Sequence, residues 1–126
     1  VADNFDKPNG LAFSPDEKLL YIADSGNPKN IRVFNVSEDG ESINKGRVFA
    51  EISPGVPDGF RVDTDGNVFT SASDGIQVFT PSGVMLGKIL VPERTANCAF
   101  GGKNRETLFI TASTSLYSIA MNAKGA

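Results

Sequence analysis

Apolar residues in this chain come in short runs that glycine, proline, asparagine and aspartate interrupt, and nowhere do they recur at helical spacing over three turns. This pattern is typical of β-strands and predicts an all-β fold. Turn-forming pairs such as Asp39-Gly40 and Asp65-Gly66 separate the runs and favour tight antiparallel connections. We expect strands at residues 11–14, 19–24, 31–35, 46–52, 59–63, 68–71, 76–80, 84–90, 98–100, 107–112 and 115–121.

The strands belong to a threefold repeat, which is the most informative feature of the sequence. Each copy opens with asparagine or aspartate and carries an aromatic residue eleven or twelve positions later. The pairs are Asn9 with Tyr21, Asp58 with Phe69 and Asn97 with Phe109. A spacing of about 40 to 50 residues between copies is the period of a four-stranded propeller blade. We therefore predict three four-stranded antiparallel blades, at about residues 8–52, 57–91 and 96–121.

Three blades raise a packing problem. Propellers close with roughly four to eight blades, because each blade buries both faces against its neighbours. An open wedge of three would expose two apolar faces, which normally mark an interface. The third unit ends after its third strand, and residues 1–5 are interpreted as the outer strand of a preceding or partner blade. We therefore expect a homodimer, or a complementary half-propeller chain, to complete the ring.

Composition restricts the chemistry. The 126 residues include no histidine, which excludes Ser-His-Asp and Cys-His hydrolysis and zinc sites of the H-E-x-x-H type. The single cysteine, Cys98, excludes an internal disulfide, and we expect it to be a small buried apolar residue. The 12 basic and 15 acidic residues give a net charge of −3, which argues against nucleic acid and anionic membranes as partners.

No segment of the chain has the pattern of a targeting or membrane sequence. No apolar run approaches the roughly 20 residues of a membrane span, and no signal peptide is visible. We expect a cytoplasmic location, with the periplasm as the alternative.

The residues that open the repeats are the candidate metal ligands. Asn9, Asp58 and Asn97 fall at one equivalent position of the repeat, just before the innermost strand, where propeller blades converge on a central channel. Converging amide and carboxylate oxygens suit a hard divalent cation such as calcium. The alternative is that Pro-Asn-Gly and Pro-Asp-Gly are ordinary turns.

Three segments resemble the gluconolactonase / senescence marker protein 30 family. They are Pro8-Asn9-Gly10-Leu11-Ala12-Phe13 with the following Leu20-Tyr21-Ile22-Ala23-Asp24, then Pro57-Asp58-Gly59-Phe60, and Asn97-Cys98-Ala99-Phe100-Gly101-Gly102. The resemblance covers the whole chain but only the C-terminal half of the family. It implies half of a six-bladed β-propeller that hydrolyses sugar lactones with one divalent cation. The implied cation ligands fall on Asn9 and Asp58, and Asp58 is also the implied general base.

From this resemblance we predict divalent-metal-dependent hydrolysis of a sugar lactone, with Asp58 as the catalytic residue and with Asn9 and Asp58 holding the cation. Calcium is the favoured ion, and zinc or magnesium are the alternatives. The family's other ligands belong to its earlier half, so a missing half or a second copy is expected to complete the site. The alternative function is a non-catalytic β-propeller interaction module, which would show no metal-dependent rise in melting temperature.

Overall fold

The computed structural model describes residues 1–126 and contains three antiparallel sheets, so the all-β prediction is confirmed. Each expected strand is present, with ends shifted by at most three residues. The first sheet contains β1 (Pro8–Phe13), β2 (Leu19–Asp24), β3 (Asn30–Val36) and β4 (Ile43–Glu51). The second contains β5 (Phe60–Val62), β6 (Val68–Ser71), β7 (Gly75–Phe79) and β8 (Met85–Leu90). The third contains β9 (Thr95–Gly101), β10 (Thr107–Ala112) and β11 (Leu116–Ala120), with the short 3-10 turn η1 (Lys103–Arg105) between β9 and β10.

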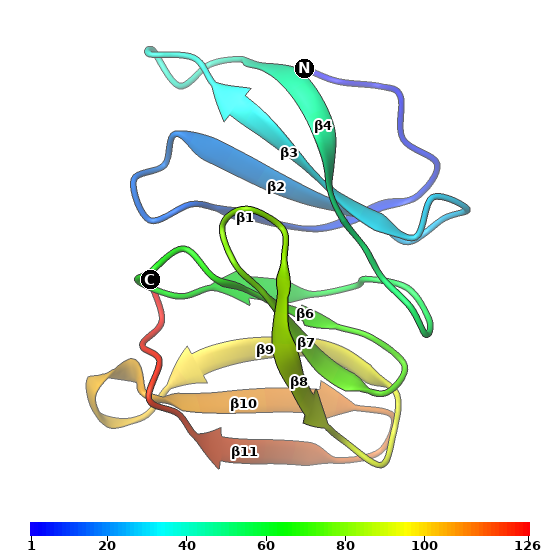
Figure 1. The fold of residues 1–126 in the computed structure, drawn as a ribbon, viewed down its shortest axis with the longest axis vertical. Coiled ribbons are helices and arrows are strands. Elements are labelled where there is room, and N and C mark those ends of the chain that lie inside the picture. The colour runs from blue at the N-terminus through cyan, green and yellow to red at the C-terminus, as the bar shows by residue number, and fades with distance from the viewer.

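The sheets follow one another along the long axis of the molecule, and strands that are consecutive in sequence pair within each sheet (Figure 1). The third sheet has three strands, as expected for a unit that ends after its third strand, and the fourth strand of its blade stays a prediction. After β11 the chain turns back to the second sheet instead of adding a strand to the third. There Gly125 bridges to Asp63, and Ala126 N donates to Val62 O (3.1 Å).

Two apolar clusters hold the three sheets together. Successive side chains of a strand point to opposite faces of its sheet, and β6 is buried on both faces because it lies in the middle sheet. Val68 joins the cluster between the first and second sheets, whereas Phe69 joins the cluster between the second and third. Cys98 belongs to the second cluster and is 3% exposed, as predicted for a buried cysteine. Burial raises the pKa of its thiol to about 12.

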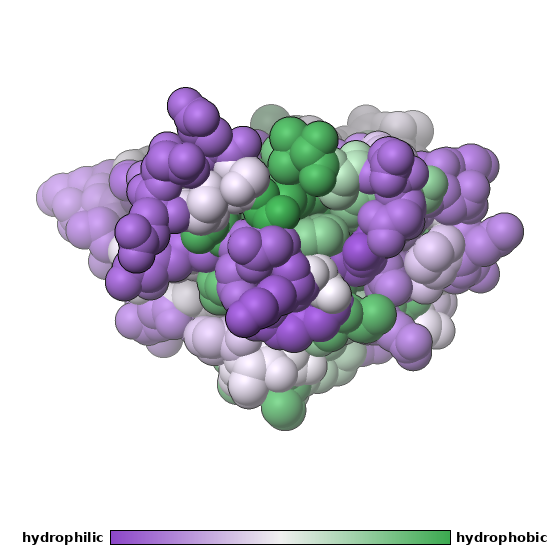
Figure 2. Space-filling view, turned by 90° about the horizontal axis from the view of Figure 1, so that it is seen from above, coloured by the Kyte–Doolittle hydropathy of each residue, from purple (hydrophilic) through white to green (hydrophobic).

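The two end sheets expose apolar side chains on their outward faces. Leu11, Phe13 and Val48 of the first sheet are 61%, 47% and 56% exposed. Figure 2 looks down on this end of the molecule and shows apolar side chains between polar ones. On the third sheet, Leu116 is 67% exposed. The solvent-exposed apolar faces expected of an open wedge are therefore present. The molecule or segment that covers them stays a prediction.

Residues 1–5 form no strand, so the expectation of an outer strand there is not met within this chain. The segment contacts β3, where the centres of the Phe5 and Phe34 rings lie 5.9 Å apart. The Arg32 guanidinium lies 4.6 Å from the centre of the Phe5 ring and 4.9 Å from that of Phe34. Pairing of this segment with a partner blade stays a prediction. The structure contains no helix that is long and apolar enough to cross a membrane.

Candidate functional site

The innermost strands β1, β5 and β9 begin next to one another, and one backbone hydrogen bond joins them at each junction. Gly10 N donates to Asp58 O (3.1 Å), and Gly59 N donates to Ala96 O (2.8 Å). A Cβ atom on Gly10 would lie 2.2 Å from Asp58 O, and one on Gly59 would lie 2.0 Å from Asn97 Oδ1. The two glycines of the Pro-Asn-Gly and Pro-Asp-Gly motifs are therefore required for contact between sheets. They bring the residues before them, the two predicted ligands, to adjacent strand starts.

Strand pairing corrects the third copy of the repeat. The equivalent cross-strand pairs are Ala12 with Tyr21, Arg61 with Phe69 and Ala99 with Phe109. Three positions before the first member of each pair lie Asn9, Asp58 and Ala96. The third equivalent residue is therefore Ala96, and Asn97 lies one position later, so its role as a third channel oxygen stays a prediction. Asn97 Oδ1 accepts a hydrogen bond from Cys98 N (2.8 Å). The repeat was aligned on the asparagine or aspartate that opens each copy, and this alignment places Asn97 one position too late. The sequence alone does not show this offset, because it does not show which residues pair across the strands.

Asn9 and Asp58 each keep a side-chain oxygen that accepts no hydrogen bond from the rest of the chain. Asn9 Nδ2 donates to Ser25 Oγ (3.1 Å), and Ser25 Oγ donates to Pro57 O (2.5 Å). Asp58 is half-buried, and its backbone N–H donates to Ser71 Oγ (3.0 Å). The structure therefore brings the two predicted residues together through Ser25 and Pro57. Their free oxygens are one carboxylate and one amide carbonyl.

A buried carboxylate supports the segment that carries Asn9. Asp24, at the end of β2, is 1% exposed and accepts hydrogen bonds from the backbone N–H groups of Asp6, Lys7 and Gly26, each at 2.9 Å. Burial opposes ionisation of Asp24. The three N–H donors and the Arg32 charge outweigh it and hold the pKa of this carboxyl below its usual range. Asp24 thereby fixes the chain just before Asn9.

Sequence reasoning did not identify Asp24 or Ser25 as part of the site. The available signal was their position, because Asp24 ends the buried strand β2 and Ser25 follows it directly. Their partners lie on segments that only the fold brings close, so the pattern could not show what they contact.

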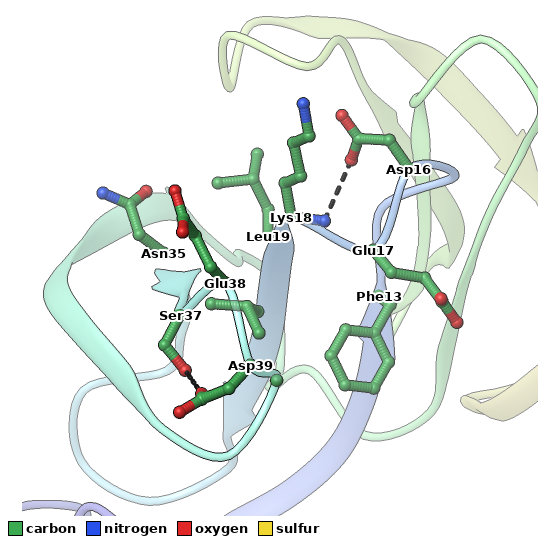
Figure 3. Close-up of a pocket in the computed structure, with 11 residues that line it drawn as sticks. Phe13, Asp16, Glu17, Lys18, Leu19, Asn35, Ser37, Glu38 and Asp39 are labelled. Carbon is green, nitrogen blue, oxygen red and sulfur yellow. Dashed lines mark hydrogen bonds between the residues drawn. The ribbon is translucent and has the colours of Figure 1, made fainter.

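A hollow on the first sheet lies away from Asn9 and Asp58. It has a volume of about 870 Å³ and is lined by the turns between β1 and β2 and between β3 and β4, at the end of β1 opposite to Asn9 (Figure 3). Two of its carboxylates accept hydrogen bonds from serines of their own turns. Asp16 accepts from Ser14 Oγ (2.6 Å), and Asp39 accepts from Ser37 Oγ (2.5 Å). No group of three or more acidic or cysteine side chains in the chain could hold a metal ion. The Asn9 and Asp58 pair therefore remains the candidate site.

Comparison with known proteins indicates a common family. The sequence profile of the SMP-30/Gluconolactonase/LRE-like region matches residues 1–114. A gluconolactonase of Zymomonas mobilis subsp. mobilis is 36% identical over 129 residues, which cover 94% of this chain and 36% of the relative. A 6-deoxy-6-sulfogluconolactonase of Pseudomonas putida is 39% identical over 110 residues, which cover 83% of this chain and 38% of the relative. This chain thus spans little more than a third of the length of these relatives.

Solved structures share the fold. A gluconolactonase from Xanthomonas campestris superposes with a TM-score of 0.87 at 36% identity, over 100% of this chain and 40% of that protein. A calcium-binding regucalcin from Agrobacterium tumefaciens superposes with a TM-score of 0.86 over 98% of this chain and 48% of that protein. The regucalcin is 19% identical and supports the propeller-type fold alone.

Proposed function

Because this chain belongs to the SMP-30/Gluconolactonase/LRE-like family, we propose that it hydrolyses a sugar lactone with a divalent cation held by Asn9 and Asp58. The observation that carries the proposal is the pair of free oxygens on adjacent strand starts, joined through Ser25 and Pro57. Relatives named gluconolactonase and sulfogluconolactonase support the substrate class.

The donor set fits a hard cation. Carboxylate and amide oxygens are ligands that calcium and magnesium prefer, and zinc also accepts a carboxylate. Calcium is the favoured ion because it tolerates irregular geometry and neutral oxygen ligands. Asn9 contributes an oxygen without charge, so Asp58 supplies the only negative charge that this pair offers.

Two ligands are a minority of the roughly six to eight that calcium takes. We propose that the three sheets are half of a six-bladed propeller and that another half-propeller, in a second copy or a complementary chain, supplies further ligands. The exposed apolar faces of the end sheets and the greater length of the relatives support this arrangement.

The reaction assigns separate roles to the two residues. When bound, a divalent cation polarises the lactone carbonyl and increases the acidity of water beside it. The Asp58 carboxylate, which no donor of the chain occupies, accepts the proton of the attacking water. The new bond forms between the water oxygen and the carbonyl carbon, and the ring C–O bond breaks. The ring oxygen takes up the proton from Asp58, which restores the carboxylate, and the product is the open-chain hydroxy acid.

The test replaces Asp58 with asparagine and uses Asp65→Asn as a matched control, because Asp65 is an exposed turn residue with the same charge. We expect D58N to lose both the calcium-dependent rise in melting temperature and lactone hydrolysis, whereas D65N keeps both. At a concentration one hundred times Kd, a bound ion stabilises by about 2.7 kcal/mol. Hydrolysis by D58N at the wild-type rate would overturn the proposal. A wild-type chain whose melting temperature responds to no divalent cation would instead favour the non-catalytic interaction module.

A further inference from the structure

We propose that Ser25 is a positioning residue that dictates which end of the Asn9 amide faces the cation. The inference rests on the proposed function, because it concerns the same metal site. It assigns a role to a residue that touches neither the ion nor the lactone.

The orientation follows from counting protons on the Ser25 hydroxyl. A serine hydroxyl has one proton to donate, and a backbone carbonyl can only accept. The 2.5 Å contact between Ser25 Oγ and Pro57 O therefore uses the Ser25 proton. Toward Asn9 the hydroxyl can then act only as an acceptor. The Asn9 atom at 3.1 Å has to be the Nδ2 donor.

The opposite amide orientation is unfavourable for the same reason. Turning the Asn9 amide over would place Oδ1 against a hydroxyl oxygen whose proton is already engaged, so two acceptors would face each other. It would also present the NH₂ group, a donor that cannot ligate a cation, in place of the oxygen. Ser25 thus keeps Oδ1 on the side of the amide that points away from itself.

Ser25 is itself held firmly. Its backbone N–H donates to Lys7 O (2.9 Å), and its neighbour Asp24 binds the N–H groups of residues 6, 7 and 26. A Cβ atom on Gly26 would lie 2.1 Å from Asp6 Oδ2, so the turn after Ser25 is closely packed. A hydroxyl on such a fixed turn can orient Asn9 without a large loss of entropy on ion binding.

The same hydroxyl also fixes the distance between the two ligands. It bonds the side chain of Asn9 on β1 and the backbone of Pro57, the residue directly before Asp58. Loss of the hydroxyl removes both bonds at once. Supporting residues of this kind typically contribute about 10- to 100-fold to metal affinity.

The second sheet provides a matched control. Ser73 lies four positions after Phe69, as Ser25 lies four positions after Tyr21, and both serines are half-buried. Its backbone N–H donates to Pro54 O (3.0 Å), but its hydroxyl makes no hydrogen bond. Ser73→Ala therefore removes a serine hydroxyl from the equivalent turn without touching Asn9 or Asp58.

The experiment compares wild type with S25A, S25T and S73A in two measurements. The first is the calcium Kd from titration calorimetry, and the second is the Asn9 side-chain NH₂ signal in ¹⁵N-resolved NMR spectra without metal. We expect S25A to weaken calcium binding about tenfold or more and to shift the Asn9 signal. S25T, which keeps a hydroxyl, and S73A should match wild type in both measurements.

Three results would overturn the inference: S25A binding calcium as tightly as wild type, S25A and S73A losing affinity equally, or an Asn9 signal unchanged in S25A. The metal-free NMR spectrum also shows whether S25A is folded, and S25T tests the hydroxyl if it is not. If wild type binds calcium and S25A matches it, only the role of Ser25 fails. If wild type binds none, the proposed metal site itself fails, and the Ser25 role in metal binding fails with it.

Discussion

Gly10→Ala is the substitution that most sharply tests how the innermost strands meet. The added Cβ would lie 2.2 Å from Asp58 O, 3.2 Å from Gly59 Cα and 3.3 Å from Asp58 C. All three are backbone atoms, so no side-chain rotation can relieve the contact. Ordinary contact begins at 3.4 Å, and the strands therefore have to separate by roughly 1 Å. This separation breaks the hydrogen bond from Gly10 N to Asp58 O.

The expected decrease in the free energy of unfolding follows from these two effects, the steric contact and the broken hydrogen bond. Overpacking typically costs about 1–3 kcal/mol, and a lost backbone hydrogen bond costs about 0.5–1.5 kcal/mol. We therefore expect G10A to lower the free energy of unfolding by about 2–4 kcal/mol. For a domain of this size, a loss of 1 kcal/mol lowers the melting temperature by about 4 °C. Melting by circular dichroism without metal should show a decrease of about 10 °C.

Gly87→Ala is the matched control, because a Cβ there meets no atom within 4 Å and the backbone is not in the left-handed region. It should change the free energy of unfolding by less than about 0.5 kcal/mol. A melting temperature of G10A within about 2 °C of G87A would refute the close junction between β1 and the strand start at Asp58.

Three further predictions concern the same junctions and the buried groups. Gly59→Ala places a Cβ 2.0 Å from Asn97 Oδ1 and should therefore lower the melting temperature. The double variant with Asn97→Gly should recover part of that loss. A loss in the double variant equal to the sum of the losses in the two single variants would contradict this contact. The lowered pKa of Asp24 means that its contribution is present above its unfolded value of about 3.9 and is lost as pH falls through the folded value. Urea unfolding at pH 7 should therefore give D24N a free energy of unfolding about 1–3 kcal/mol below that of wild type. The free energies of the two proteins should converge at strongly acid pH. A constant difference at all pH values would be inconsistent with this. Burial and a thiol pKa of about 12 predict that Cys98 reacts with a disulfide reagent only in urea, and rapid labelling of the native chain would argue against the packed second cluster.

The strands were predictable because each needs only local information. Short apolar runs bounded by turn residues mark β2, β6 and β10 directly, since alternate side chains of these strands enter a core. The turn at Asp65-Gly66 was equally visible, and Gly66 adopts the left-handed φ of 86° that such a turn requires. The end of the third unit after its third strand was also visible, but the bridge from Gly125 back to Asp63 of the second sheet is a long-range contact that no local pattern encodes.

The site was predictable only in part. Asn9 and Asp58 were identified by their motifs, and strand pairing puts them at equivalent positions. Asn97 has the right residue type but is displaced by one position, which only cross-strand pairing can show. Asp24 and Ser25 contact partners on distant segments, so only the fold shows these contacts.

The central claim is that Asn9 and Asp58 share one divalent cation. Anomalous diffraction from crystals of the protein grown with calcium tests this most directly. We predict one peak at about 2.3–2.6 Å from both the Asn9 Oδ1 and the Asp58 carboxylate, the range of calcium–oxygen bonds. A peak bound only by the Asp16 and Asp39 turns around the hollow of Figure 3, or no peak near Asp58 at saturating calcium, would contradict it.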